Sequence, residues 1–213
     1  MSTMGSTSTS TVQKTEIVSL PPVADPAPLG LGAFALTTFL FSALNAHLTK
    51  GTTAWLGYAF AYGGLAQLLA GMWEFRNRNV FGATAFSTYG AFWIGAGLYI
   101  ELVVPAAKPT AAQLGNDLAW ITLAFLIFNT YMLIFSLYVN KAVFTVFLTL
   151  ELTELILIIG NFSSSTSAIK VGGVVGIITA AAAWYTSAAG VLNGLAGRHI
   201  IPVGKPMPLP SAS

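Results

Sequence analysis

Six long apolar runs, separated by short polar stretches, make up most of the chain. They occupy residues 29–48, 54–73, 83–104, 118–139, 143–160 and 171–192. A membrane hydrocarbon core about 30 Å thick is crossed by roughly 20 apolar helical residues, which is close to the length of each run. The runs do not alternate apolar and polar residues as the strands of a membrane β-barrel do. The pattern therefore predicts an all-α membrane protein, a bundle of six transmembrane helices.

The composition agrees with a chain that lipid surrounds. Hydrophobic residues make up 55% of the sequence, charged residues make up 8%, and the mean hydropathy is +0.74. So few polar side chains cannot cover a soluble globule of this length. The sequence contains no cysteine, which excludes disulfides, thiolate metal sites and thiol catalysis. Its net charge of +2 comes from scattered cations, which argues against a nucleic-acid surface.

Polar segments flank the apolar part of the chain at both ends. Residues 1–24 begin with an almost pure run of Ser and Thr, which has nothing to bury, so we expect a disordered N-terminal tail. Residues 198–213 are rich in proline and are expected to behave in the same way. The predicted transport domain is residues 25–197, the six-helix transmembrane part.

The charged residues of the loops predict how the bundle lies in the membrane. Cytoplasmic loops of membrane proteins carry an excess of Lys and Arg. If the N-terminus is cytoplasmic, six cations lie inside and three outside: Lys14, Arg76, Arg78, Lys141, Arg198 and Lys205 against Lys50, Lys108 and Lys170. We therefore expect both termini on the cytoplasmic side of the plasma membrane.

Two glutamates interrupt the fifth apolar run. Glu151 and Glu154 are three residues apart, so a helix presents them on one side. A charged side chain at the centre of a bilayer costs about 2.5–3.5 kcal/mol, so these carboxyls should be protonated, hydrogen-bonded to a neighbouring helix, or exposed to water. The functional interpretation is proton handling along a conduit. The structural alternative, hydrogen bonding between helices or subunits, is equally open.

Four further polar residues within the spans are candidates for contact with a solute. Gln67 follows two glycines that permit close approach, and its amide both donates and accepts hydrogen bonds, as a small carboxylate would require. Asn45 offers a second amide. Thr37 and Thr38 add hydroxyls, although threonine in a helix often bonds back to its own backbone. We find no metal-ligand spacing, nucleophile elbow or phosphate loop, so an enzyme, a metal site or a cofactor is not expected.

Prolines mark the start of the first span. The sequence Asp25-Pro26-Ala27-Pro28-Leu29-Gly30 places fixed-φ residues without amide donors where a first helical turn tolerates them. The amides of that turn and the helix dipole would attract a carboxylate. Asp25 is also a good N-cap, so its own carboxylate is expected to bind these amides and to compete with an incoming anion.

Four motifs resemble the acetate uptake transporter family, also called the succinate–acetate permeases. In chain order they are DPAPLGL (25–31), YGGLAQ (62–67), FGATAFSTYGAFW (81–93) and IGN (159–161). The resemblance covers roughly residues 25–204. It implies six helices per protomer, a homohexameric ring, and a conduit in each protomer for acetate and sometimes larger carboxylates, commonly proton-coupled.

The resemblance also implies an apolar constriction. Its three residues correspond to Phe34, Tyr89 and Leu150, and Ala183 and Tyr185 are expected to line the same passage. A narrow apolar neck resists a continuous file of water and favours a small, weakly hydrated or protonated acid over inorganic ions.

The chain departs from the family pattern in two places. The first helix usually starts with Asn-Pro, where this chain has Asp25. The positions of Glu151 and Glu154 are usually uncharged.

We therefore expect a proton-coupled transporter of acetate or related small carboxylates, with protons and the carboxylate as its ligands. A passive channel for the acetate anion is the first alternative. A membrane sensor or scaffold that has kept the fold is the second, and the lack of a sizeable soluble domain argues against it.

Overall fold

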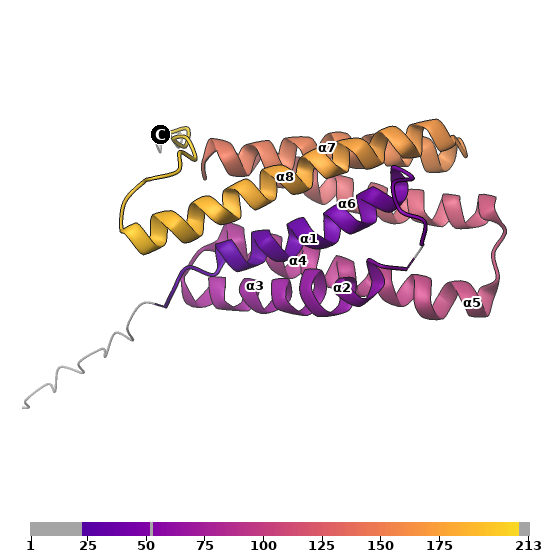
Figure 1. Cartoon of the computed structure of the whole chain (residues 1–213), viewed down its shortest axis with the longest axis horizontal. Coiled ribbons are helices and arrows are strands. Elements are labelled where there is room, and N and C mark those ends of the chain that lie inside the picture. The colour runs from indigo at the N-terminus through magenta and orange to yellow at the C-terminus, as the bar shows by residue number, and fades with distance from the viewer. Residues whose placement is uncertain (1–22, 52, 209–213) are drawn as a thin grey trace, which may run out of the picture.

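The structure is a computed structural model that describes residues 23–51 and 53–208, and every regular element within these ranges is helical (Figure 1). The elements are α1 (Ala27–Asn45), α2 (Leu56–Phe60), the π-helix η1 (Ala61–Ala66), α3 (Gln67–Arg76), α4 (Val80–Leu98), the π-helix η2 (Tyr99–Val103), α5 (Val104–Ala107), α6 (Ala111–Ser136), α7 (Lys141–Phe162) and α8 (Thr166–Ala196). The expectation of an all-α protein is confirmed.

Five helical stretches of the described residues are long and apolar enough to cross a membrane. They are Ala27–Asn45, Val80–Ala107, Ala111–Ser136, Lys141–Phe162 and Thr166–Ala196. The second run of the sequence is also helical, over residues 56–76, but as the three consecutive elements α2, η1 and α3. This stretch is not among the five, so a sixth crossing stays a prediction.

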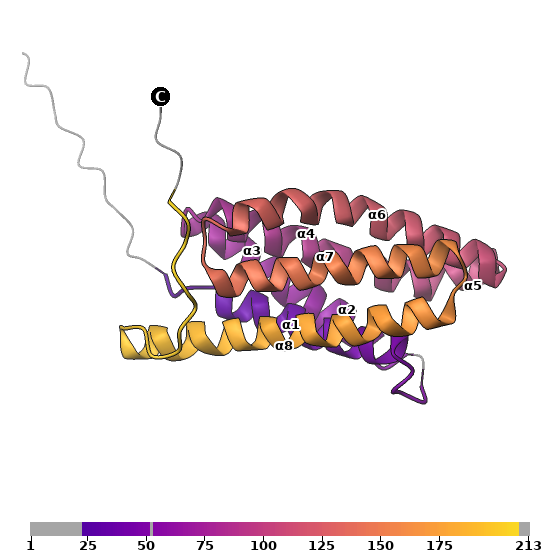
Figure 2. The same cartoon turned by 90° about the horizontal axis from the view of Figure 1, so that it is seen from above.

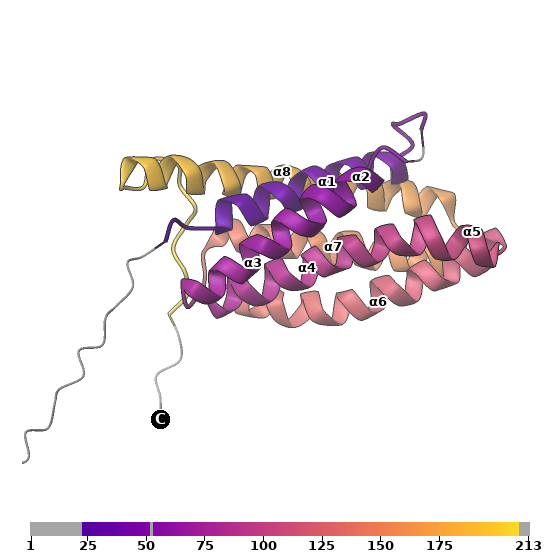
Figure 3. The same cartoon turned by 90° about the horizontal axis from the view of Figure 1, so that it is seen from below.

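The helices form a bundle whose long axes run in roughly the same direction (Figures 1 and 2). α8 packs against both α1 and α7, α7 packs against α6, and α3 packs against α4. α1 also contacts η1 and α3, so it joins the α7–α8 side of the bundle to the α2–α4 side (Figure 3). The start of α1, the α3–α4 and α6–α7 turns and the end of α8 all lie at one end of the bundle.

Small residues allow α1 and α8 to approach closely. A Cβ atom added at Gly173 would meet the backbone of Asn45 and Ala46, and one added at Gly176 would meet the side chain of Ser42. Lipid provides no hydrophobic force between helices, so close backbone packing of this kind is what stabilises their association.

α1 begins at the prolines, as the sequence predicts. Pro26 is the N-cap, Ala27 is the first helical residue and Pro28 the second. Oδ1 of Asp25 accepts a hydrogen bond from the amide of Ala27 at 2.9 Å. The expected contact between the Asp25 carboxylate and the first turn is therefore present.

Residues 198–208, which we call the C-terminal strap, differ from the expected disordered tail. The Asn193 side chain accepts hydrogen bonds from the amides of Ile200 and Ile201, at 2.7 and 2.9 Å. Further along, the carbonyl of Val203 accepts from the amide of Ala142 at 2.9 Å, so the strap returns from α8 to the start of α7. Residues 1–22 and 209–213 lie outside the described residues, so the disorder expected of the N-terminal tail stays a prediction.

Candidate functional site

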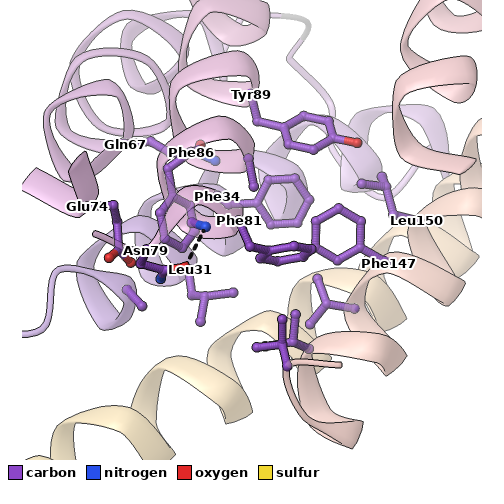
Figure 4. Close-up of a pocket in the computed structure, with 16 residues that line it drawn as sticks. Leu31, Phe34, Gln67, Glu74, Asn79, Phe81, Phe86, Tyr89, Phe147 and Leu150 are labelled. Atoms are coloured by element: carbon purple, nitrogen blue, oxygen red, sulfur yellow. Dashed lines mark hydrogen bonds between the residues drawn. The ribbon is translucent and has the colours of Figure 1, made fainter. Parts of the chain in front are cut away.

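A cavity of about 70 Å³ lies inside the bundle near the end where α1 begins (Figure 4). Ala27 of α1, Gln67 and Glu74 of α3, Phe81 of α4 and Val143 of α7 are among the residues that line it. This first cavity is several times larger than the about 10–15 Å³ that a single water needs.

A second cavity of about 60 Å³ lies deeper in the bundle. Three residues line both the first and the second cavity, and they are Phe34, Tyr89 and Leu150. The rings of Phe34 and Tyr89 meet edge to face with their centroids 5.6 Å apart. Figure 4 shows these two rings with Leu150 at one side of the first cavity. We call these three residues the neck, since they separate two adjoining cavities.

Two more cavities continue the row toward the other end of the bundle. The third, of about 90 Å³, shares Trp93 and Thr122 with the second and is lined by Asn45. The fourth shares Leu118 and Asn161 with the third. The row thus runs from the α3–α4 turn to the α7–α8 turn.

The hydroxyl of Tyr89 is held by a buried polar network. It donates to Oδ1 of Asn129 at 2.9 Å, and Nδ2 of Asn129 donates to Oε2 of Glu151 at 2.6 Å. Oε1 of Glu151 accepts from the hydroxyl of Thr130 at 2.8 Å. This network holds the ring of Tyr89 in place through the hydrogen bond from its hydroxyl to Asn129 of α6.

The two glutamates of α7 have different surroundings. Glu151 binds Asn129 and Thr130 of α6, as described above, and lines none of the four cavities. Glu154 is buried, lines the second cavity, and its Oε2 has no hydrogen-bond partner among the described residues. Residues three apart on a helix differ by about 60° in direction, which accounts for the separation.

Gln67 and Glu74 contribute polar atoms to the first cavity. Both residues are only 1% exposed, and the Oε1 atom of each lacks a partner within the described ranges. Glu74 follows the predicted second span, which ends at Trp73. Desolvation by burial raises the pKa of Glu74 from its ordinary value of 4.5 to about 7; a hydrogen bond from Asn79 opposes this rise, and the charge of Asp25 adds to it.

Most residues around the first turn of α1 do not line the first cavity, but they anchor the start of α1 beside it. Asp25, Pro26, Pro28 and Gly30 are not among the lining residues, whereas Ala27 between them is. The carbonyl of Pro28 accepts a hydrogen bond from Ser187 at 2.6 Å, which ties this turn to α8. A Cβ atom at Gly30 would overlap the ring of Phe86, so glycine permits α1 to approach α4 here.

Three residues expected on the passage line none of the four cavities. Thr37 is buried against Gly63, and its hydroxyl donates to the carbonyl of Tyr58 at 3.4 Å. Ala183 is packed into the apolar core. Tyr185 is half-exposed, and its hydroxyl donates to Pro202 of the C-terminal strap at 2.6 Å. Each of the three packs against another element, and their places on the passage stay predictions.

The other predicted pathway residues do line cavities. Gln67 lines the first, Thr38 the second and Asn45 the third. Two residues were not predicted as part of the site: Glu74, which follows the predicted second span, and Asn129. Asn129 lies in the middle of an apolar run, which is the signal by which Glu151 and Glu154 were found.

A family model described as the GPR1/FUN34/yaaH family matches residues 8–209. The chain belongs to this family. It is 40% identical over 195 residues to "Acetate permease A" of Emericella nidulans. That match covers 84% of this chain and 65% of the relative, so the chain spans less than two thirds of that relative's length. It is 33% identical over 183 residues to the "Succinate-acetate/proton symporter SatP" of Escherichia coli, covering 86% of this chain and 96% of that protein.

A solved structure of a family relative has the same fold. The "Structure of the bacterial acetate channel SatP" matches with a TM-score of 0.78 and 33% sequence identity, and covers 86% of this chain and all of the other. Together with the apolar helices, these relatives identify an integral membrane protein of a transporter and channel family. The family resemblance read from the four motifs is confirmed.

Proposed function

We propose that this protein carries acetate and related small monocarboxylates across the plasma membrane through the row of cavities, coupled to protons. The observation that carries the proposal is the neck: Phe34, Tyr89 and Leu150 are the residues that the first two cavities share. Relatives that are named as an acetate permease, a succinate-acetate/proton symporter and an acetate channel support the choice of solute.

An apolar neck suits this task because a hydrated ion must lose its hydration shell to pass it, which costs much free energy. Inorganic ions keep their hydration shells and do not pass a short apolar constriction, whereas a small acid with a methyl group and a neutralised carboxyl does. All three neck side chains are buried. They therefore form a size filter within the bundle.

Polar groups on each side of the neck provide successive hydrogen bonds for the solute. Gln67 lies on the first side, and Thr38 and then Asn45 lie beyond the neck. The buried carbonyl of Gln67 lacks a partner in the described part of the chain, so it is available to a protonated acid. In this proposal the acid moves from one such group to the next.

Two buried carboxyls along the row of cavities favour proton-coupled transport rather than a passive channel. Glu74 lines the first cavity and Glu154 the second, and each retains an oxygen that no described residue binds. The oxygens of Glu151 accept from Asn129 and Thr130, which favours the structural alternative for that residue. We assign proton handling to Glu154 and Glu74.

The proposal includes the assembly that the family resemblance implies and the orientation that the loop charges predict. We propose that residues 54–73 form the sixth crossing, that six protomers form a ring, and that both termini are cytoplasmic. The orientation is supported by the cations at the end of the bundle where α1 begins and α8 ends, which are Arg76, Arg78, Lys141, Arg198 and Lys205. Lys14 lies outside the described residues.

Proteoliposomes test the function directly. Purified protein in vesicles with a clamped membrane potential is given labelled acetate and an inward proton gradient. Uphill accumulation of acetate, abolished by a protonophore and absent from empty vesicles, is the expected result. Flux that only follows the acetate gradient and the membrane potential would instead establish a channel, and no flux at all would favour the sensor or scaffold.

A further inference from the structure

The C-terminal strap crosses the end of the bundle at which the first cavity lies. It runs from the end of α8 to the α6–α7 turn, residues 137–140 (Figure 2). The first cavity reaches this end, because its lining includes Ala27 at the start of α1, Asn79 directly before α4, and Val139 in the α6–α7 turn. The described residues of the strap do not line the cavity themselves. The strap therefore acts on the cavity through the elements that it holds.

Hydrogen bonds join the strap to both ends of the α6–α7 turn. The amide of Met207 donates to the carbonyl of Leu137 at 2.8 Å. The amide of Ala142 donates to the carbonyl of Val203 at 2.9 Å. Val139, between these two contacts, forms part of the wall of the first cavity. Because α6 packs mainly against α7, the strap ties the tip of this pair of helices to the end of α8.

Asn193 of α8 is the main anchor at the other end of the strap. Its Oδ1 accepts from the amides of Ile200 and Ile201, at 2.7 and 2.9 Å, and its Nδ2 donates to the carbonyl of Ile201 at 2.9 Å. The hydroxyl of Tyr185 adds one bond, to the carbonyl of Pro202. Within the described part of the chain, Asn193 thus makes three of the six hydrogen bonds that join the strap to the helices and the turn.

The strap is held by hydrogen bonds rather than by burial. Ile201 and Val203 are partly buried, the other strap residues are exposed, and none of them belongs to the apolar core. A segment with exposed hydrogen bonds and little buried apolar surface opens while the rest of a protein stays folded. Pro202, Pro206 and Pro208 restrict its backbone, so it detaches and returns as a stiff unit.

We propose that the C-terminal strap is a latch on the entrance to the first cavity. When it is bound, it holds the α6–α7 turn against the bundle and keeps the entrance narrow. When it is released, the turn moves outward with Val139 and a solute enters. The proposal rests on the proposed transport function and adds a control of access that is separate from the neck.

A reversible disulfide that closes the latch is the first test. A Cβ atom added at Gly204 would lie 2.7 Å from Cβ of Lys141. The Cβ atoms of a disulfide are about 3.8 Å apart, so a shift of about 1 Å allows Lys141→Cys and Gly204→Cys to be joined. Gly204 has a φ of +75°, where cysteine is strained, so the oxidised and reduced forms of the same vesicles are compared. Oxidation should slow uptake of labelled acetate, reduction should restore it, and neither single variant should respond.

Asn193→Ala is the opposite test, because it releases the latch. The loss of the Asn193 hydrogen bonds should make the open strap about tenfold more frequent and raise the initial rate of acetate uptake accordingly. Thr186→Val is the matched control on α8. The hydroxyl of Thr186 bonds only within its own helix, to the carbonyl of Ala182, so this variant should keep the wild-type rate.

Thiol labelling measures access to the first cavity without any transport. Leu31 is buried on α1 and lines the first cavity, and the natural chain has no cysteine. In the full-length protein in detergent, a small thiol reagent should modify Leu31→Cys about tenfold faster when Asn193→Ala is also present. An unchanged labelling rate, or uptake that oxidation of the double-cysteine variant does not slow, would overturn the latch. Faster labelling in a protein that carries no acetate would support the latch and refute the transport function instead.

Discussion

The hydroxyl of Tyr89 donates a hydrogen bond to Asn129 at 2.9 Å, and both side chains are buried. Asn129 in turn donates to Glu151 at 2.6 Å and to the carbonyl of Phe147 at 3.1 Å. One amide on α6 thus connects the neck on α4 with a carboxyl on α7. The orientation of the Tyr89 ring depends on this amide, although Asn129 lines none of the four cavities.

Asn129→Leu should destabilise the protein and loosen the neck. The substitution leaves the Tyr89 hydroxyl and one oxygen of Glu151 without partners, and each unsatisfied buried group costs about 1–3 kcal/mol. We expect a lower melting temperature in detergent and a faster leak of larger acids in vesicles. Tyr89→Phe keeps the ring but breaks the same hydrogen bond and leaves only Oδ1 of Asn129 without a partner, so it should lose about 1–3 kcal/mol and change selectivity in the same direction. Equal selectivity in Asn129→Leu and wild type would contradict the role of this network.

Leu150→Ala should widen the neck and admit larger acids. Removing the side chain from the boundary of the two cavities enlarges the passage, so uptake of labelled lactate or succinate should rise relative to acetate. Leu157→Ala is the matched control, because Leu157 is equally buried on the same helix and lines the second and third cavities but not the first. Unchanged selectivity in Leu150→Ala, or the same change in both variants, would count against the neck.

Glu74 should make stability depend on pH. Its pKa is raised by burial to about 7, so the folded state binds a proton more tightly than the unfolded chain does. The resulting stabilisation is complete below about pH 4.5 and is lost as the pH rises through about 7. Glu74→Gln keeps the shape and removes the titration. Melting temperatures measured across this range should therefore fall with pH more steeply in the wild type than in Glu74→Gln, and parallel curves would refute the assignment.

Asp25→Asn should keep the fold and raise the apparent affinity for acetate near neutral pH. Oδ1 of Asp25 occupies the amide of Ala27, which lines the first cavity, and an ionised Asp25 repels an approaching carboxylate. Asparagine can accept the same hydrogen bond without the charge. Concentration dependence of labelled acetate uptake measures the effect. A lower affinity in Asp25→Asn would mean that the carboxyl of Asp25 assists the solute.

The apolar runs predicted most of the fold because hydropathy along a helix reports directly on lipid contact. The second run was harder to interpret, because Gly63 and Gly64 lie in a π-helical segment that divides it. Which face of each helix looks inward depended on packing that the sequence does not display. Thr37 and Thr38 are neighbours, yet Thr37 packs against Gly63 and Thr38 lines the second cavity.

Motifs in the sequence point to the neck, whereas the contacts between helices and the C-terminal strap cannot be read from the sequence. The neck residues came from the family resemblance, and two cavities meet at those residues. The hydrogen bond from Tyr185 to Pro202 could not be predicted, because proline content alone makes the C-terminal strap look disordered. Glu74 was missed because it lies at the end of its helix, beside a polar turn.

Labelling of a single cysteine in the neck is the most direct test of the central claim, that acetate passes between Phe34, Tyr89 and Leu150. The natural chain has no cysteine, so Leu150→Cys introduces a single thiol, and Tyr185→Cys on the outer surface serves as its control. We predict that a small charged thiol reagent blocks acetate uptake by Leu150→Cys vesicles, that acetate slows this block, and that Tyr185→Cys vesicles keep full uptake. Full acetate uptake by Leu150→Cys vesicles whose thiol is shown to be modified would contradict the account.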